Sequence, residues 1–404
     1  MIIKETIKEV YQHQENLLAG ADLGIERELL ANINFSSNHV LIISGIRRCG
    51  KSVLMKQFLH KKLSSCSFLN FEDPRLDDFE LQDFIKLEQI IEPQKTEVIA
   101  FDEIQNVAGW EKYIRSKQDE GQNLILTGSN ASMLSKEFGT RLTGRYLRKE
   151  LFPFSYSEFL QFMKTEPGTE SLSIYLDTGG FPEFLKNGDE EILYHILDDI
   201  IYRDIAVRYG IRQHHVLRQM AIYLISNSGK KFTLNSLLKI LNIGSVRSVA
   251  DYYSYFEDSY LLFSVPMFSY SLKKQLVNPR KIYSIDTGLA GTNSISLSKD
   301  FGRKLENLIF LHLRNAHKNL YYFSDERECD FVISEKGKVI QVIQVCLSLN
   351  PDNFDREVNG IISALATFNL DEGYLITFDQ EDRLEKNKKL IHVIPAWKWL
   401  LNGK

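Results

Sequence analysis

The stretch LIISGIRRCGKSVLMKQFLH, residues 41–60, decides the fold. It opens with residues typical of a buried strand and closes on residues with the apolar spacing of a helix. Between them, GIRRCGKS at residues 45–52 matches the pattern GxxxxGK[ST]. A strand before this pattern and a helix after it are the context that identifies a phosphate-binding P-loop. The sequence therefore predicts an α/β fold with a phosphate cradle after a buried strand.

Each part of this loop has a chemical task in nucleotide binding. Its glycines let backbone amides turn toward phosphate oxygens, and the N-terminus of the following helix adds positive partial charge. We expect Lys51 to reach the β- and γ-phosphates of ATP and the Ser52 hydroxyl to ligate Mg²⁺. The predicted nucleotide-binding residues are Gly45, Ile46, Arg47, Arg48, Cys49, Gly50, Lys51, Ser52 and Val53.

A second strand supplies the acids that such a loop requires. In EVIAFDEIQ, residues 97–105, an apolar run predicts a buried strand and is followed by Asp102 and Glu103. We expect Asp102 to be the second Mg²⁺ partner and Glu103 to be the general base that activates the attacking water. The alternative is a pair of solvated acids at the end of a strand.

A third strand and two arginines extend the predicted site. NLILTGSNASML, residues 123–134, places Asn130 beyond an apolar strand, at the edge where ligands bind in open α/β sheets. We expect Asn130 or Ser129 to orient the water and sense the γ-phosphate, although the alternative is a simple N-cap for the helix that follows. Arg141 and Arg145 lie four residues apart. Either could act as an arginine finger on a neighbouring subunit's ATP, and the alternative is that both are exposed helix arginines.

Several motifs, taken in order, resemble a known family. The chain carries GIRRCGKS, FDEIQ, LTGSN, LTGR followed by LFPFSYSEF, and GGFPEFL. Together they resemble a bacterial and archaeal family of AAA+ ATPases whose members carry a C-terminal domain of unassigned function. Residues 259–291, which end in DTGLAG, resemble the signature of that domain. The resemblance implies a P-loop AAA+ parallel sheet, a winged-helix module and a restriction-endonuclease-like α/β C-terminal domain.

Length and composition are consistent with a cytoplasmic protein of several domains. The 404 residues exceed the usual size of one domain, and the net charge of −4 gives no global signal for nucleic acid or membrane. The four cysteines lack metal-ligand spacing, and we expect neither a signal peptide nor a membrane span. The predicted domains are an ATPase core at 1–160, a helical lid at 161–225, a winged helix-turn-helix at 226–290 and a nuclease-like domain at 291–404.

The predicted helix-turn-helix lies within residues 232–263. Two short helices flank a turn at Asn242, Ile243 and Gly244, and a wing strand is expected to begin at residue 261. Thr233 and Ser245 are the expected N-caps. The expected inward residues of the second helix are Val246, Val249, Tyr253 and Phe256.

The same region carries a local positive charge. Residues 230–281 hold eight Lys or Arg against three Asp or Glu. This excess predicts contact with DNA phosphates, and the alternative is a winged helix used only for protein contacts. The candidate phosphate contacts are Lys230, Lys231, Arg247, Lys273, Lys274, Arg280 and Lys281.

The last third of the chain is expected to follow the order helix, strand, hairpin, helix and strand of restriction-endonuclease-like folds. Such nucleases use a helix Glu, a strand Asp and an E-x-K element to bind metal and activate water. Glu306 and Asp330 match the first two, but the third element begins at Gln344. An amide replaces the carboxylate there, and Cys346 replaces the lysine. We therefore expect a degenerate site on a DNA-binding or partner-binding scaffold.

Three functional interpretations follow. The favoured one is an AAA+ ATPase that hydrolyses ATP with Mg²⁺ to control attached DNA-binding modules, acting on DNA as a homo-oligomer that could form a ring. The alternative is an ATP-dependent signalling switch that binds protein partners without DNA. The third is an ATP-regulated nuclease. No interaction with membranes is expected in any of them.

Overall fold

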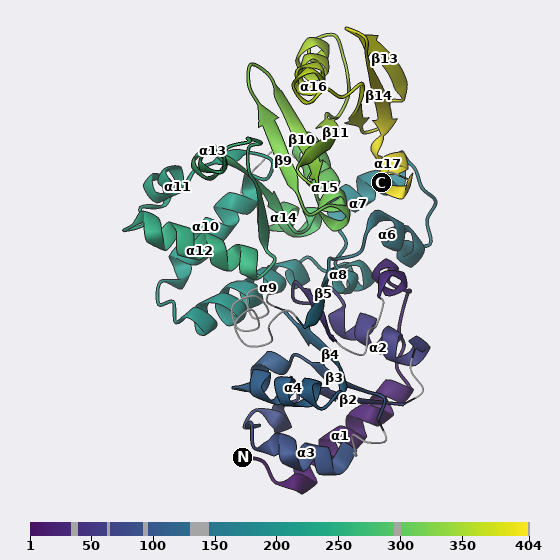
Figure 1. Ribbon diagram of the computed structural model, residues 1–404, viewed down its shortest axis with the longest axis vertical. Coiled ribbons are helices and arrows are strands. Elements are labelled where there is room, and N and C mark those ends of the chain that lie inside the picture. Colours follow the sequence, from purple (N-terminus) through teal and green to yellow (C-terminus); the bar gives the residue numbers. More distant parts are fainter. Residues whose placement is uncertain (34–38, 63–64, 92–95, 130–144, 295–299, 403–404) are drawn as a thin grey trace. The chain divides into compact units, whose positions relative to one another are not determined.

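The computed structural model of the chain divides into two compact units (Figure 1). Unit 1 consists of Met1–Phe152 and Asp258–Tyr260, and unit 2 of Pro153–Glu257 and Leu261–Lys404. Among the described helices, none combines the length and the apolar character that a membrane-spanning segment needs. The structure describes residues 1–33, 39–62, 65–91, 96–129, 145–294 and 300–402.

Unit 1 is built on a five-stranded parallel sheet. Its elements are α1 (Lys4–Ala19), β1 (Val40–Gly45), α2 (Lys51–Lys62), β2 (Cys66–Asn70), α3 (Asp83–Ile91), β3 (Val98–Asp102), α4 (Trp110–Asp119), β4 (Asn123–Gly128) and β5 (Tyr146–Leu151). The strand order is β2-β3-β4-β1-β5. Residues of α1, α3 and α4 share one hydrophobic core with the sheet, and α2 packs on β1 and β4. Every residue of β1 and β3 is buried, as expected for parallel strands covered on both faces.

The first part of unit 2 is helical, as predicted for residues 161–225. Its helices are α6 (Tyr156–Met163), α7 (Thr169–Thr178), α8 (Pro182–Asn187), α9 (Glu191–Asp199), which continues into a π-helical segment at Ile200–Val207, and α10 (His214–Ser226). Phe159 in α6 belongs to the same hydrophobic core as Leu305 and Trp399. Apart from Asp258–Tyr260, the predicted lid, helix-turn-helix and C-terminal domain thus lie in one compact unit, which begins at Pro153.

The predicted pair of short helices is present in unit 2. α11 (Leu234–Leu241) and α12 (Val246–Asp258) flank a turn in which Asn242 has a φ of 50°. Thr233 caps α11, and the Ser245 hydroxyl accepts a hydrogen bond of 3.0 Å from the Ser248 amide. A three-stranded antiparallel sheet accompanies these helices, in the order β6-β8-β7. Its strands are β6 (Lys231–Phe232), β7 (Leu262–Val265) and β8 (Arg280–Ser284), with α13 (Leu272–Val277) between β7 and β8.

The inward face of α12 differs from the prediction at one position. Val249, Tyr253 and Phe256 are buried, as expected. Val246 is 41% exposed, so that part of the prediction is wrong. It is the first residue of α12 and follows the exposed Ser245, so burial begins only one turn further along the helix.

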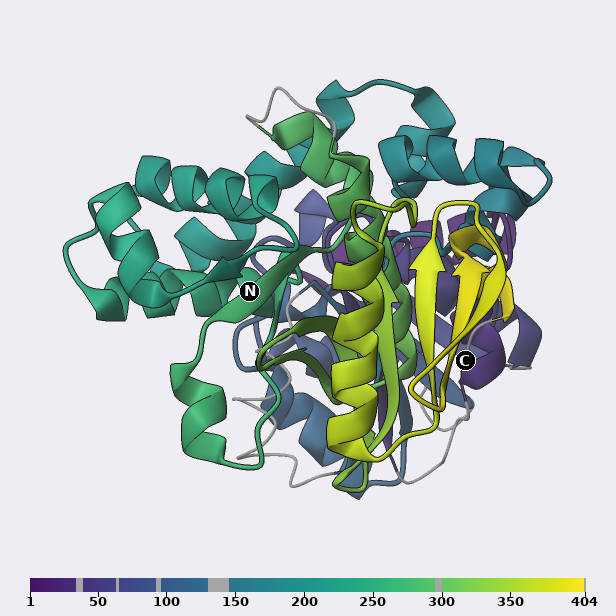
Figure 2. The same cartoon turned by 90° about the horizontal axis from the view of Figure 1, so that it is seen from above.

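The C-terminal part of unit 2 is a six-stranded mixed sheet. Its elements are α14 (Thr287–Asn293), α15 (Phe301–Ala316), β9 (Leu320–Ser324), β10 (Glu328–Glu335), β11 (Lys338–Val345), α16 (Phe354–Phe368), β12 (Glu372–Thr377), β13 (Asp382–Lys386), β14 (Lys389–Pro395) and α17 (Ala396–Asn402). The strand order is β13-β14-β12-β11-β10-β9. Figure 2 shows α16 lying along these strands, where its side chains form a core separate from that of α15 and α17. The predicted order of elements is present up to β12, and β13, β14 and α17 extend it.

Two of the quoted motifs, GGFPEFL and DTGLAG, meet at a close backbone contact in unit 2. Asp286 caps α14 and also accepts a hydrogen bond of 2.7 Å from the Gly180 amide. A Cβ on Gly179 would overlap the Asp286 carboxylate, and one on Gly288 would lie 2.0 Å from the Thr178 carbonyl oxygen. Space alone therefore requires glycine at these two positions.

Candidate functional site

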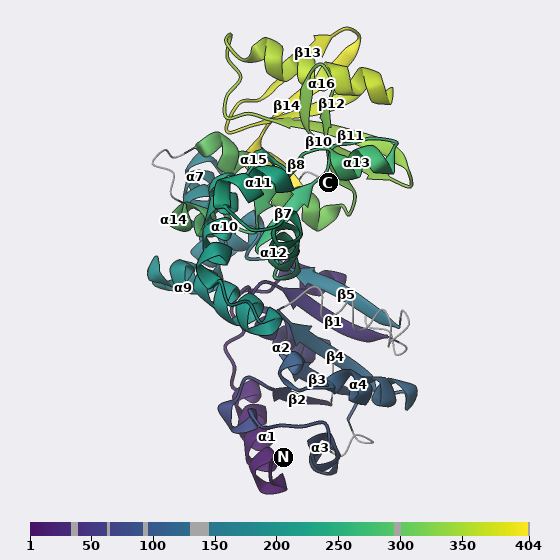
Figure 3. The same cartoon turned by 90° about the vertical axis from the view of Figure 1, so that its left-hand side faces the viewer.

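The P-loop leaves the carboxyl edge of the unit 1 sheet between β1 and α2 (Figure 3). Gly45 ends β1, and a Cβ there would lie 2.1 Å from the Leu151 carbonyl oxygen of β5. Arg48 and Gly50 have φ values of 62° and 98°, so the loop turns through left-handed backbone. Lys51 begins α2. The predicted strand, loop and helix are therefore all present.

Some side chains of the P-loop region are buried and others are exposed to solvent. Ile46, Cys49 and Lys51 are buried, whereas Arg48 and Val53 are exposed. Burial raises the pKa of the Cys49 thiol, so this cysteine packs as a neutral group.

Arg27 holds the backbone of the P-loop, a role that no motif in the sequence indicated. Its buried guanidinium donates hydrogen bonds of 2.7 Å to the carbonyl oxygens of Cys49 and Phe152. In a trans peptide the carbonyl and the next amide point in opposite directions. Fixing the Cys49 carbonyl therefore directs the Gly50 amide away from Arg27, toward the open side of the loop. Gln57 of α2 in turn holds the segment that precedes Arg27, because its side-chain amide donates to the Leu23 and Ile25 carbonyls at 2.8 and 2.6 Å.

The acid pair lies at the end of β3, as predicted. Asp102 is the last residue of β3 and Glu103 follows with a φ of 51°. Thr127 of β4, which lies between β3 and β1, joins them. Its hydroxyl donates to Asp102 Oδ1 and accepts from the Glu103 amide at 3.0 Å. Thr127 thus positions both acids, a role that depends on the strand order and that the sequence reading did not assign.

The surroundings of Asp102 fit a divalent cation. Burial, followed by the charge of Glu103, raises the pKa of Asp102 to about 6. Within the described residues, Asp102 Oδ2 has no hydrogen-bond partner although it is fully buried. A buried acceptor of this kind is costly unless a donor or cation satisfies it. Asp102 and the nearby Ser52 hydroxyl, which lowers its pKa, are the residues that would hold Mg²⁺.

Lys51 and Glu103 face each other across the site. The Lys51 ammonium lies 3.5 Å from Glu103 Oε1 and donates to the Ile46 carbonyl at 3.2 Å. Gln105 donates to the other Glu103 oxygen. Both charged side chains are buried, so their interaction is less screened than at a surface.

The other predicted polar residues are only partly placed. Asn130 and Arg141 lie outside the described residues. Arg145 precedes β5, and its carbonyl accepts from the Val40 amide at the start of β1. It therefore lies at the amino edge of the parallel sheet, opposite the P-loop, and its side chain pairs with Asp119 at 3.0 Å. Arg145 cannot reach the ATP of its own chain, and a role on another subunit's ATP stays a prediction.

A segment distant in sequence contacts the strand that leads into the P-loop. Tyr260, which belongs to unit 1, is buried, and its hydroxyl lies 2.7 Å from that of Ser44. Arg148 of β5 donates to both hydroxyls and pairs with Glu150 at 2.6 Å. This network was not visible in the sequence motifs.

The seven residues predicted to contact DNA differ in their exposure and in their partners. Lys230, Arg247, Lys273 and Lys274 are exposed. Lys231 pairs with Glu328 at 2.7 Å, and Arg280 is partly buried near the Ser264 hydroxyl. Lys281 is buried and bound by carboxylates, so its prediction as a DNA contact is wrong. The charge count along the sequence could not distinguish these environments.

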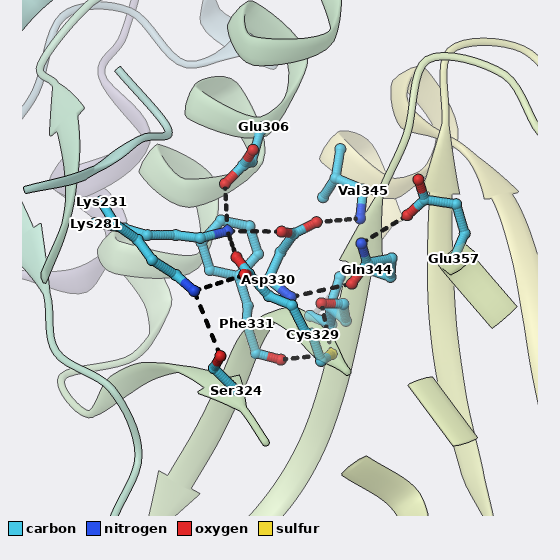
Figure 4. A network of polar contacts seen from close by, with 12 residues as sticks. Lys231, Lys281, Glu306, Ser324, Cys329, Asp330, Phe331, Gln344, Val345 and Glu357 are labelled. Carbon is cyan, nitrogen blue, oxygen red and sulfur yellow. Dashed lines mark hydrogen bonds and ion pairs between the residues drawn. The ribbon is translucent and has the colours of Figure 1, made fainter. Parts of the chain in front are cut away.

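The three residues of the predicted degenerate nuclease site do come together in unit 2, around Lys281 (Figure 4). Lys281 Nζ lies 2.7 Å from Asp330 Oδ1 and 3.1 Å from Glu306 Oε1. Gln344 accepts from the Asp330 amide at 3.1 Å. Burial and the charge of Asp330 raise the pKa of Glu306 to about 7. Burial lowers the pKa of the Lys281 ammonium, but the negative charges around it, that of Asp330 first, raise this pKa well above its usual value.

Two family models match the chain. Residues 37–160 match an AAA domain, which agrees with the site just described. Residues 169–299 match a domain of unknown function, and this range includes the elements from α7 to α14, with β6, β7 and β8 among them.

Two relatives extend along most of the chain. The uncharacterized protein MJ1544 of Methanocaldococcus jannaschii is 36% identical over 401 residues, covering 91% of this chain and 90% of that one. An uncharacterized protein of Haemophilus influenzae is 29% identical over 341 residues, covering 78% and 84%. Among solved structures, the Walker-type ATPase PABY2304 of Pyrococcus abyssi has a TM-score of 0.41 and 16% identity, over 63% of this chain and 90% of that chain. This chain therefore belongs to the same family as MJ1544, and its residues 37–160 form an AAA domain.

Proposed function

We propose that this protein hydrolyses ATP with Mg²⁺ in unit 1 and uses its nucleotide state to control DNA binding by unit 2, as a homo-oligomer. The observation that carries the proposal is the convergence of Lys51, Asp102 and Glu103 at one edge of the sheet. The Lys51 and Glu103 side chains are 3.5 Å apart, and Asp102 keeps a buried oxygen without a hydrogen-bond partner among the described residues.

Each residue has a task in hydrolysis. The P-loop amides and Lys51 bind the phosphate oxygens and neutralise charge that develops during phosphoryl transfer. Bound Mg²⁺ would supply positive charge to the β- and γ-phosphates, and Ser52 and Asp102 would hold it. Glu103 accepts a proton from the attacking water, and Gln105 and Thr127 fix its position.

Exposed basic residues support the DNA-binding part. Lys230, Arg247, Lys273 and Lys274 are exposed on the segment that contains the helix pair and the three-stranded sheet. Lysine and arginine at such positions neutralise phosphates and release counterions. We propose that this segment is a winged helix whose phosphate contacts include Lys273 and Lys274 of α13.

A charge-reversal experiment tests this part. Lys273→Glu with Lys274→Glu should weaken binding to labelled duplex DNA and lower the slope of log affinity against log salt by about 2, measured by fluorescence anisotropy with and without ATP. The matched control is Lys112→Glu with Arg115→Glu, because both of these α4 residues are exposed and carry the same charge. The control should bind DNA like wild type. If wild type binds no duplex at about 50 mM salt, the DNA-binding part of the proposal is wrong. This result would not affect the part that concerns ATP hydrolysis.

The homo-oligomer is tested separately. Arg145 lies at the edge opposite its own P-loop, so an arginine finger at this position requires a second subunit. Sizing of wild type and Glu103→Gln with Mg²⁺ and ATP should show a larger species than nucleotide-free protein. A monomer under all of these conditions would contradict this part.

A further inference from the structure

The ammonium of Lys281 lies inside a cage of three carboxylates. Its Nζ is 2.7 Å from Asp330, 3.0 Å from Glu328 and 3.1 Å from Glu306. The side chain of Lys281 is only 4% exposed. A lysine ammonium has three N–H donors, so three carboxylate partners occupy all of them.

The carboxylates belong to different elements from the cation. Glu306 comes from α15, and Glu328 and Asp330 from β10. Lys281 comes from β8, which pairs with β6 and β7. The small antiparallel sheet of unit 2 therefore supplies the cation, and α15 and β10 supply the three carboxylates.

The oxygens of the cage are already used. Asp330 Oδ1 binds Lys281, and Oδ2 accepts from the Val345 amide at 3.0 Å. Glu306 Oε1 accepts from both Lys281 and the Tyr283 hydroxyl, which lies 2.7 Å away. Within the described residues, these contacts engage both oxygens of Asp330 and one oxygen of Glu306.

Gln344 has a structural role at the position where the predicted nuclease site would need a carboxylate. Its side-chain oxygen accepts from the Asp330 amide at 3.1 Å, and its nitrogen donates to Glu357 at 2.7 Å (Figure 4). The amide thus links β10, β11 and α16, a task that needs both a donor and an acceptor. A carboxylate at this position would have no hydrogen to donate to Glu357.

We propose that Lys281 is the built-in cation of this site: its ammonium takes the place of a divalent metal ion among Glu306, Glu328 and Asp330, so that unit 2 binds no metal there and cleaves no phosphodiester. Hard divalent ions select the carboxylate oxygens that here surround Nζ. The cage is consequently a latent divalent-cation site, which opens when the lysine is removed. This inference goes beyond the proposed ATPase, because it concerns side chains of unit 2 alone.

Mn²⁺ binding to the full nucleotide-free chain tests the proposal. All proteins carry Asp102→Asn, so that the carboxylate at the end of β3 does not contribute to Mn²⁺ binding. Adding Lys281→Met should create one Mn²⁺ site per chain, counted by electron paramagnetic resonance, and adding Asp330→Asn to that variant should remove it. In the presence of Lys281, Asp330→Asn should leave Mn²⁺ binding unchanged. Two results would overturn the proposal: loss of a Mn²⁺ site on Asp330→Asn while Lys281 is present, or a folded Lys281→Met variant that gains no site.

A second measurement covers a Lys281→Met variant that does not fold, since its carboxylates would lose their partner. The thermal midpoint of the Asp102→Asn protein with and without Mn²⁺ is compared with that of the same protein carrying Asp330→Asn. An equal Mn²⁺-induced shift in both supports an ammonium-filled cage. A shift that Asp330→Asn abolishes shows that the metal, and not Lys281, fills the site.

Discussion

The hydroxyl of Tyr260 lies 2.7 Å from the hydroxyl of Ser44, the residue that precedes the first glycine of the P-loop. Tyr260 follows α12 almost directly in the chain, and its backbone has a φ of 62°, which is unusual for a residue with a side chain. This contact lies within unit 1 and joins a residue far along the chain to the strand that carries the ATP site.

Tyr260→Phe should destabilise unit 1. The substitution keeps the ring but leaves Ser44 and Arg148 without their shared partner in a buried place. We expect the free energy of unfolding to fall by about 1–3 kcal/mol, measured by urea denaturation. Tyr270→Phe is the matched control, because Tyr270 is 83% exposed and should show no change. Equal stability of both variants would show that the Tyr260 hydroxyl contributes nothing.

Arg27→Met should weaken nucleotide binding. The guanidinium holds the Cys49 carbonyl and so orients the Gly50 amide. Hydrogen bonds from a charged group contribute about 1.5–3 kcal/mol, so we expect a loss of affinity of about tenfold or more, measured by titration with a fluorescent ATP analogue. Arg115→Met on exposed α4 should bind like wild type. Unchanged affinity in a folded Arg27→Met protein would remove Arg27 from the site.

Mg²⁺ should enhance nucleotide binding more strongly as the pH rises. Burial and Glu103 raise the pKa of Asp102 to about 6, so below this pH a proton occupies the carboxyl that would bind Mg²⁺. The ratio of affinities with Mg²⁺ and with EDTA should fall by up to about tenfold per pH unit below that point. Asp102→Asn should give a ratio that does not change between pH 5 and 8. A flat ratio in wild type would contradict the assignment of Asp102.

The same pKa determines how the stability of unit 1 depends on pH. Because the pKa of Asp102 is raised above its ordinary value of 3.8, the folded state binds the proton more tightly than the unfolded state. Without Mg²⁺, the contribution of Asp102 to the free energy of unfolding is therefore lost as the pH rises toward about 6. Mg²⁺ with nucleotide should restore stability above that pH.

Gly288→Ala should destabilise unit 2 strongly. The new Cβ would lie 2.0 Å from the Thr178 carbonyl oxygen, and backbone atoms cannot move away as a flexible side chain can. We expect a loss of about 3 kcal/mol or more in the free energy of unfolding, measured by chemical denaturation. Gly244→Ala is the control, since a Cβ there meets nothing within 4 Å. Similar stability of the two variants would contradict the close contact.

The local parts of the ATP site could be predicted from the sequence. The P-loop and the acid pair each follow a buried strand, so their residue types and their place at the carboxyl edge are fixed within a few residues. The same holds for the caps at Thr233 and Ser245, which depend on neighbouring amides. Val246 was misplaced because helical spacing identifies a face but not where along the helix burial begins.

The long-range parts could not be predicted. Arg27, Thr127 and Tyr260 gain their roles from contacts with residues far along the chain, which no local pattern specifies. Lys281 shows the limit most clearly. In the sequence it belongs to a basic segment, and only the pairing of β8 with its neighbours turns it toward Glu306 and Asp330.

The most direct test of the central claim is steady-state ATP turnover by wild type and Glu103→Gln, with Mg²⁺-ATP affinity measured on the same proteins. If Glu103 is the general base, the variant should bind Mg²⁺-ATP with nearly wild-type affinity, while its turnover should fall by about 10²–10⁴-fold. Equal turnover by both proteins, or no turnover by wild type with or without DNA, would contradict the account.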